Sequence, residues 1–421
     1  MDAGRKTEDW IREHESELIG FLQTLIRIPS VTGEEAEIQH FISDYVKSLG
    51  AEVDTFDTDP NLIQNHPAYI KTSQSYKGRP NVVATFKGTG GGKSLLLNGH
   101  VDVVPENADG GWRFPPRSAV IENGRLYGRG ASDMKSGIAA MTMAMKAVAE
   151  CGLKLKGDVI FEYVVDEETT GNAALDCALR GYKADAGICC ATSDMCIAPG
   201  CIGRYWFTIH VKGKAPIGIQ KHYEGISAIE LGYIVKHAID EFEKFRKETV
   251  RHPYYEDINS TIPCTVLKIS SGLSSSYPEE CELKGSMALV SDEDPNTIKK
   301  SFEHFIKSYC QEQSPWLKEH PVEIFWEGYN GEPSQVSADS PIVLSASTAY
   351  EEIMGEKPKI KGRRGPADNS YMTLYADTPS IVFGPGITDE IHIVNESVLI
   401  KDYIDSIRIL ARMIINWCGI F

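Results

Sequence analysis

Two almost continuous apolar runs constrain the fold of this chain more than any other feature. They occupy residues 94–105 (SLLLNGHVDVVP) and 159–165 (VIFEYVV). Runs that are apolar on both faces are typical of strands buried at the centre of a sheet. Between them, residues 136–151 are rich in Ala and Met and are expected to form a helix. Strands that alternate with helices in this way predict an α/β fold.

The flanking segments extend the same pattern toward both ends of the chain. Apolar periodicity predicts further helices at 8–28, 34–49, 341–355 and 401–418. β-rich runs predict strands at 51–57 and 81–88, a hairpin at 121–130, and a strand in PSIVFGPG at 379–386. We therefore expect one domain formed by residues 1–202 and 327–421, with a mixed central sheet flanked by helices.

The pattern changes near residue 203, which indicates an inserted domain at 203–326. Residues 204–213 alternate like a half-exposed strand, and a long amphipathic helix is expected at 224–247. Strand-like runs at 263–270 and 281–290 precede a helix at 295–311. This order predicts an α+β domain with an antiparallel, ferredoxin-like sheet.

Composition limits the partners and the location of the chain. Its 421 residues carry 43 basic and 59 acidic side chains, a net charge of −16, which disfavours nucleic acid and anionic membranes. No apolar run approaches the roughly 20 residues that a transmembrane helix needs, and the first residues are charged and polar. We expect a cytoplasmic protein with mostly free thiols. Cys189, Cys190, Cys196 and Cys201 lack paired CxxC spacing, which favours buried small side chains over zinc ligands.

Four short segments contain residues that could bind a metal or take part in catalysis. They contain His100 with Asp102, then Asp133, then Asp166-Glu167-Glu168, and finally His392 after Gly384-Pro385-Gly386. Each segment alone has a structural alternative. These are a hydrogen-bonded pair at a strand end, a helix cap, an acidic solvated loop, and a histidine with a purely structural role.

The four segments share one property that the structural alternatives do not explain. Each begins where a predicted buried strand or its following turn emerges. In an open α/β sheet, ligands bind outside the carboxyl ends of the strands. Imidazole and carboxylate groups are zinc ligands, and a cation would relieve the repulsion between adjacent carboxylates. The sequence therefore predicts a metal centre at this edge of the sheet.

The segments GHVDVVP, GRGASDMKSG, VVDEETTGNA and GPGITDEIH together resemble the M20 metallopeptidase family. The resemblance is to the branch of acetylornithine deacetylase and succinyl-diaminopimelate desuccinylase, and it covers nearly the whole chain. It implies a zinc-peptidase-like catalytic domain and an inserted lid domain that often mediates homodimers. It also implies hydrolysis of the amide bond of a small N-acyl amino acid or dipeptide-like substrate.

The same resemblance implies a role for each motif residue. Two zinc ions, with Co²⁺ or Mn²⁺ as alternatives, are expected on four ligands: His100, Asp133, Glu168 and His392. Asp133 bridges the two ions, and Asp102 orients His100. Zinc lowers the pKa of water toward neutrality, and Glu167 is the general base that takes the proton from that water.

The chain departs from the family pattern at one metal ligand. The family has an acidic ligand in a Glu-Pro-Thr-like motif, but residues 190–195 read Cys-Ala-Thr-Ser-Asp-Met here. Ala191 stands where the carboxylate is expected, so the ion served by His100 keeps only two ligands, His100 and Asp133. Cys190 and Asp194 are the available replacements. We expect one or two ions, with the second site weakened.

The lid also departs from the pattern. A Gly-Lys-Ala-Ala-His-like motif normally supplies a histidine to the oxyanion, but residues 213–218 read Gly-Lys-Ala-Pro-Ile-Gly. His222 is the nearest histidine that follows. The remaining side chains considered for substrate binding are Arg204, Arg363, Arg364 and Gly386. For the arginines, salt bridges at the surface or between domains are the alternative.

These departures leave two other functions open. The fold could serve a non-hydrolytic biosynthetic step, or the chain could be a catalytically impaired binding homologue. The persistence of the general base and of four predicted ligands favours metal-dependent hydrolysis.

Overall fold

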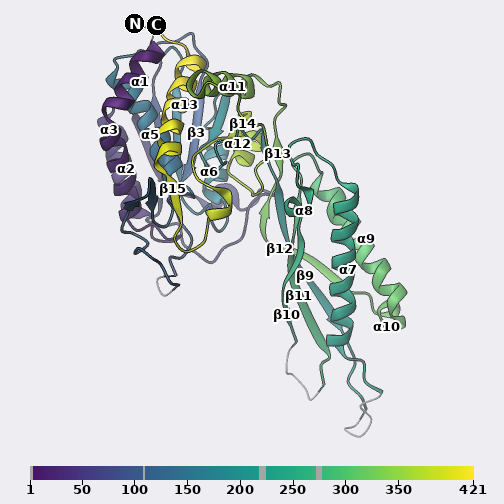
Figure 1. The fold of residues 1–421 in the computed structure, drawn as a ribbon. Helices are drawn as coiled ribbons and strands as arrows, with labels where there is room; N and C mark the ends of the chain where they lie inside the picture. The colour runs from purple at the N-terminus through teal and green to yellow at the C-terminus, as the bar shows by residue number, and fades with distance from the viewer. Residues whose placement is uncertain (1–2, 108–109, 218–223, 272–276) are drawn as a thin grey trace. The chain divides into compact units, whose positions relative to one another are not determined.

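The computed structural model describes residues 3–107, 110–217, 224–271 and 277–421. The chain forms two compact units (Figure 1). The first comprises residues 1–201, 334–363 and 367–421, and the second comprises residues 202–333 and 364–366. That the first unit is a catalytic domain and the second a lid stays a prediction.

The first unit is built on a six-stranded mixed sheet, as the alternation of strands and helices predicts. Its order is β1 (Glu52–Asp57), β2 (Pro80–Phe86), β6 (Val159–Val164), β3 (Leu95–His100), β7 (Ala186–Cys189) and β14 (Ser380–Val382). β6, β3, β7 and β14 are paired in parallel, and β2 pairs antiparallel with both β1 and β6. The carboxyl ends of the four parallel strands therefore meet at one edge of the sheet.

Helices bury both faces of this sheet. On β3, Leu95 and Leu97 join the main core with α5 (Lys135–Glu150), whereas Leu96 packs with Met372 of α12 (Asn369–Tyr375). α3 (Ala36–Ser48) and α13 (Ile400–Cys418) contribute to the same core as α5, and α6 (Asn172–Arg180) packs against α12. Burial on both faces explains why β3 reads as a continuous apolar run.

Further helices and several short strands complete the first unit. The helices are α1 (Ala3–Glu13), α2 (Glu15–Arg27), α4 (Pro60–Ile63), α11 (Pro341–Met354) and the 3-10 turn η2 (Thr388–Glu390). The strands are β4 (Val120–Glu122), β5 (Arg125–Tyr127), β8 (Gly200–Cys201), β13 (Ser334–Gln335) and β15 (Ser397–Leu399). The prediction of a single helix at 8–28 is wrong, because the helix is interrupted at His14. The ring of His14 stacks on Trp10 at 4.1 Å, and its Nδ1 lies 2.8 Å from the Trp10 carbonyl oxygen.

The second unit has the ferredoxin-like order that the sequence predicts. In chain order it contains β9 (Gly203–Lys212), α7 (Ala228–Thr249), α8 (Ile258–Thr261), β10 (Cys264–Ser270), β11 (Glu280–Leu289), α9 (Pro295–Gln313), α10 (Pro315–Glu319) and β12 (Glu323–Gly331). The four strands form an antiparallel sheet in the order β10-β11-β9-β12. α7 begins four residues later than predicted, because the hydroxyl of Ser227 caps it by accepting from the Glu230 N–H.

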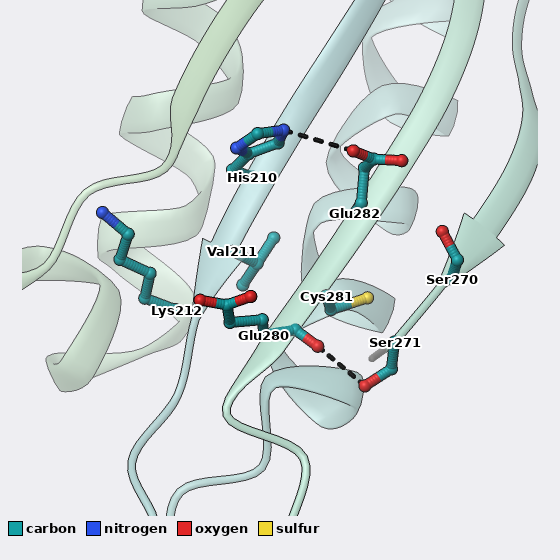
Figure 2. A pocket seen from close by; sticks show the side chains of 8 residues that line it. All are labelled: His210, Val211, Lys212, Ser270, Ser271, Glu280, Cys281 and Glu282. Atoms are coloured by element: carbon teal, nitrogen blue, oxygen red, sulfur yellow. Dashed lines mark hydrogen bonds and ion pairs between the residues drawn. The ribbon is translucent and has the colours of Figure 1, made fainter. Parts of the chain in front are cut away.

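A pocket lies on the sheet of this second unit, along β9, β11 and the end of β10 (Figure 2). His210 and Glu282 face each other across β9 and β11, and their side-chain atoms lie 3.3 Å apart. The hydroxyl of Ser271 donates to the Glu280 carbonyl at 2.7 Å. Both side chains are partly exposed, so this contact contributes little to stability.

The ten cysteines are free thiols, as predicted, and all except the partly exposed Cys196 are buried. Among the described helices, none combines the length and the apolar character that crossing a bilayer requires.

Candidate metal centre

Four side chains predicted as metal ligands lie together in the first unit. His100 ends β3, Asp133 lies in the turn before α5, and Glu168 follows β6. Each of these three offers a ligand atom, and the three atoms all lie within 4.8 Å of one another. His392, in the loop after β14, places its Nε2 3.0 Å from Glu168 and 3.5 Å from Asp133. Residues far apart in sequence therefore meet at the predicted edge of the sheet.

The spacing of these atoms fits a divalent cation. Zinc binds nitrogen and oxygen at about 2.0–2.1 Å, so two ligands in a tetrahedral site lie roughly 3.3 Å apart. His100 Nε2 is 3.3 Å from Asp133 Oδ1, and the two distances to His392 are also close to this value. The side chains of His100, Asp133 and Glu168 are nearly inaccessible to solvent, which favours ligand geometry over a solvated acidic loop.

Asp102 orients the loop that carries the acidic residues. Its carboxylate accepts hydrogen bonds from the backbone N–H groups of Glu167 and Glu168 at 3.1 and 3.2 Å, and from the Thr32 hydroxyl at 2.9 Å. The same carboxylate lies 3.6 Å from His100 Nδ1, whereas the backbone carbonyl of Asp102 lies 2.9 Å from that nitrogen. With Nδ1 donating to this carbonyl, Nε2 is left as the metal-binding nitrogen.

The adjacent carboxylates of Asp166, Glu167 and Glu168 contact different partners. Asp166 turns into a buried network, where it accepts from the Tyr76 hydroxyl at 2.7 Å and lies 3.4 Å from the Arg79 guanidinium. Glu167 Oε2 lies 3.7 Å from His100 Nε2, and Glu168 contacts His392. Only two of the three acidic groups therefore face the centre.

Burial and charge set the protonation of these groups. Burial raises the pKa of Glu167 to about 7, and the carboxylates of Glu168 and Asp133 contribute in the same direction. Burial would also raise the pKa of Asp133, but hydrogen bonds to His100 and His392 hold that pKa well below its usual range. Hydrogen bonds to Asp133 and Glu168 raise the pKa of His392 to about 10. A carboxylate that titrates near neutral pH suits a general base.

A carboxylate that sequence reasoning missed holds Asp133 in place. Glu396 accepts hydrogen bonds from the backbone N–H groups of Ser132 and Asp133 at 2.9 and 3.0 Å, and it pairs with Arg129 at 2.7 Å. All of these groups are buried. No local pattern marks Glu396, because it lies more than 260 residues along the chain from its partners.

Asp368 is a second acidic residue that the sequence did not point to. It is buried, and neither of its carboxylate oxygens has a hydrogen-bond partner among the described residues. Burial, followed by the charge of Glu167, raises the pKa of Asp368 well above its usual value. Burial therefore disfavours the charged form of Asp368, close to the predicted general base.

The position where the family resemblance predicts a carboxylate is buried, and neither of the two proposed replacements joins the ligand group of the described residues. Ala191 follows β7 and is 2% exposed. The Cys190 thiol lies 3.9 Å from the Ile188 carbonyl, and burial raises its pKa, which disfavours the thiolate. The carboxylate of Asp194 accepts hydrogen bonds from the backbone N–H and hydroxyl of Thr388, at 2.7 and 2.8 Å. Neither side chain belongs to the group of converging donors found in the described chain.

Of the arginines predicted as substrate anchors, Arg363 lies at the centre. Its Nε donates to the Thr192 carbonyl at 3.3 Å, and its terminal nitrogen lies 4.0 Å from Asp133 Oδ2. Its side chain is 9% exposed. Burial opposes the charge on Arg363, but the carboxylates of Asp133 and Glu167 raise its pKa.

Four further residues were considered for substrate binding. Arg204 and Arg364 belong to the second unit, and Arg364 donates to the Ser260 hydroxyl at 3.3 Å. Gly386 has a φ of +102°, and a Cβ there would lie 2.9 Å from Ser132 Oγ, so glycine permits close packing beside Asp133. His222 lies outside the described residues. Substrate binding by these residues stays a prediction.

Comparison with known proteins identifies the family. A model of peptidase family M20/M25/M40 matches residues 96–416. The chain belongs to this family. The resemblance predicted from the sequence is confirmed, and this M20 chain is a hydrolytic enzyme.

Two curated relatives and one solved structure cover almost the whole M20 chain. It is 30% identical over 97% of its length to an N-formyl-4-amino-5-aminomethyl-2-methylpyrimidine deformylase from Bacillus subtilis, covering 96% of that protein. It is 25% identical over 95% of its length to a succinyl-diaminopimelate desuccinylase from Hydrogenovibrio crunogenus, covering 99% of that protein. Human carnosine dipeptidase 1 shares its fold, with a TM-score of 0.74, 17% identity and 99% coverage of both chains.

Proposed function

We propose that this M20 hydrolase is a zinc-dependent deacylase that removes a formyl group from the primary amine of a small molecule. The substrate that we expect first is N-formyl-4-amino-5-aminomethyl-2-methylpyrimidine or a close analogue. The deformylase relative supports this choice because it is the more similar of the two curated relatives described above. Both relatives are named for removing an acyl group, which supports deacylation more broadly.

The observation that carries the proposal is the convergence of His100, Asp133, Glu168 and His392 beside Glu167. A divalent ion held by these ligands would activate water and polarise the scissile carbonyl. We propose that Glu167 takes a proton from the attacking water and returns it to the leaving amine. Its carboxylate lies 3.7 Å from His100 Nε2, next to the proposed ligands.

A formyl substrate is also consistent with the absence of the family's histidine from residues 213–217. The described part of the segment that aligns with the family's lid histidine, residues 213–217, contains no histidine. A formyl carbonyl carries only hydrogen on its acyl side, so it is the least hindered amide carbonyl for attack. We propose that this carbonyl tolerates the loss of one oxyanion donor better than a larger acyl group would.

The assembly and location belong to the same proposal. By resemblance to other M20 lids, the second unit would form a homodimer, and light scattering on the purified protein tests this. A cytoplasmic location would be tested by fractionation of the source cells.

The function is tested by measuring product release from a panel of acylated amines. Zinc-loaded enzyme should release formate from the N-formyl pyrimidine faster than it hydrolyses N-acetyl or N-succinyl amino acids or dipeptides. Glu167→Gln should lower turnover by about 100- to 10,000-fold, because it removes the general base, while metal content stays unchanged. Glu37→Gln, at an exposed position on α3, is the matched control and should retain full activity.

Two results would contradict the proposal. Full activity of Glu167→Gln would remove the role assigned to that carboxylate. Metal-loaded enzyme that hydrolyses no member of the panel would reject deacylation of small amines.

A further inference from the structure

The centre contains several acidic groups, and Ala191 stands where the family pattern predicts a further carboxylate. Asp133, Glu167 and Glu168 face the same buried region. Buried carboxylates need positive partners. The inference below rests on the proposed metal-dependent function, and it concerns where that positive charge comes from.

We propose that the centre holds one divalent ion and that the guanidinium of Arg363 supplies the positive charge that a second ion would otherwise provide. Three observations place Arg363 in this role. Its terminal nitrogen is within ion-pair distance of Asp133, at 4.0 Å. It is nearly buried, so its charge acts in a region of low dielectric constant. It is also fixed beside the position of the missing ligand.

Hydrogen bonds of the loop after β7 fix Arg363 beside position 191. Arg363 Nε donates to the carbonyl of Thr192, the residue directly after Ala191. The Thr192 hydroxyl in turn donates to the carbonyl of Ser132, the residue directly before Asp133. The guanidinium is thus held next to the backbone from which a carboxylate at position 191 would extend.

The backbone of Arg363 is fixed as well. Its N–H donates to the Gly200 carbonyl at 2.9 Å, and it forms a parallel bridge with Cys201. A long side chain anchored at both its backbone and its Nε has little freedom to leave Asp133. Its charge is therefore a permanent part of the centre.

Ala191 and Arg363 both disfavour a second metal ion. A carboxylate at position 191 would attract a second cation, and Ala191 offers none. A fixed guanidinium beside Asp133 repels a second cation, and it remains when no metal is present. Loss of the ligand and gain of the fixed charge both favour a single ion, while the positive potential around the acidic groups is kept.

The proposal is tested by counting zinc ions on metal-stripped, full-length protein titrated with Zn²⁺, using calorimetry and elemental analysis. The wild type should bind one ion per chain. Arg363→Met should bind that ion about tenfold or more tightly, because a repelling charge is removed from the pocket. The double variant Ala191→Glu with Arg363→Met should bind two ions, whereas Ala191→Glu alone should still bind one.

Two further variants separate charge from structure. Arg363→Lys keeps the charge and should match the wild type in ion count, with an affinity much closer to the wild type than that of Arg363→Met. Arg180→Met is the matched control, since Arg180 contacts Asp176 and Phe56, and it should leave zinc binding unchanged. Circular dichroism of each variant identifies any that fails to fold.

The possible outcomes distinguish this inference from the proposed function. Two ions on the wild type, or an unchanged affinity in a folded Arg363→Met variant, would overturn the role of Arg363 alone. A double variant that is folded yet binds only one ion would also overturn it. A wild type that binds no ion at all would overturn the metal-dependent function itself.

Discussion

Glu396 lies next to Asp133 in space, and it accepts hydrogen bonds from backbone N–H groups and from Arg129, not from a predicted ligand atom. Two N–H groups, from Ser132 and Asp133, point at one of its oxygens, and Arg129 pairs with the other. The direction of the Asp133 carboxylate therefore depends on a residue that contributes no ligand. Groups of this kind around metal ligands commonly change metal affinity by 10- to 100-fold when they are removed.

We expect Glu396→Gln to weaken zinc binding by about 10- to 100-fold. The amide would set an N–H₂ group against Arg129 or against the two backbone N–H groups, so the turn at Asp133 would loosen. A zinc titration with a competing chelator measures the change. Asp158→Asn is the control, because Asp158 pairs with Lys87 and accepts from the Gly88 N–H, and it contacts none of the predicted ligands. Unchanged zinc affinity in Glu396→Gln would show that Asp133 holds its position without this support.

Glu162 is a buried acid on β6 that faces away from the main core. It accepts one hydrogen bond, from the Asn98 side chain at 3.2 Å, and burial raises its pKa to about 7. The unfolded chain releases this proton near pH 4.5, whereas the folded chain keeps it until about pH 7. The free energy of unfolding should therefore fall as the pH rises through this interval.

We expect Glu162→Gln to remove this pH-dependent fall in the free energy of unfolding. Each pKa unit corresponds to about 1.4 kcal/mol, so the variant should be more stable by roughly 3 kcal/mol at pH 8 and nearly equal to the wild type at pH 4.5. The amide could also donate to Asn98 Oδ1, which has no hydrogen-bond partner within the described chain. Denaturant unfolding of chelator-treated protein between pH 4.5 and 8 measures the difference. Parallel stability curves for the variant and the wild type would contradict this account.

At the scale of elements, α5 and the end of β7 position the centre through one close contact. A Cβ on Gly137 of α5 would lie 1.8 Å from the Cys190 carbonyl oxygen. Cys190 and Ala191 in turn approach Gly384 in the loop after β14, where a Cβ would lie 2.3 Å from the Cys190 carbonyl oxygen. The helix that follows Asp133 and the loop that lacks the ligand are thus packed backbone to backbone.

We expect Gly137→Ala to lower the free energy of unfolding by about 2–4 kcal/mol, because backbone must move to admit the methyl group. Gly20→Ala in α2 is the matched control. A Cβ there meets nothing within 4 Å, so the change should be neutral or stabilising by about 0.5–1 kcal/mol. Urea unfolding of both variants measures the difference. Equal stability of the two would mean that the α5 contact with β7 is loose.

The elements also show what the sequence could predict and why it failed elsewhere. β3 and β6 were predictable because burial on both faces leaves long apolar runs. β7, which lies between β3 and β14 in the sheet, was missed because its four residues are too few to show a period. The motif residues that follow strands were predictable from local sequence. The pair of Glu396 with Arg129 was not, since only the folded chain brings these segments together.

At the scale of the whole molecule, the family and the fold were predictable, and the substrate was not. The order of strands and the four motif segments indicate an M20 hydrolase before any coordinates are known. The choice between formyl, succinyl and peptide substrates depends on side chains with no recognisable spacing, and here it comes from relatives. Arg363 illustrates the limit, because the sequence offered it as one of three arginines without placing it at Asp133.

The central claim is that side chains distant in the chain converge to hold a divalent cation. Crystals of the full chain soaked in zinc, measured on both sides of the zinc absorption edge, test this most directly. The account predicts one anomalous peak within bonding distance of Asp133 and Glu168, with an imidazole of His100 or His392 as a further ligand. A soaked crystal with no peak at these residues, or with zinc bound only elsewhere, would contradict it.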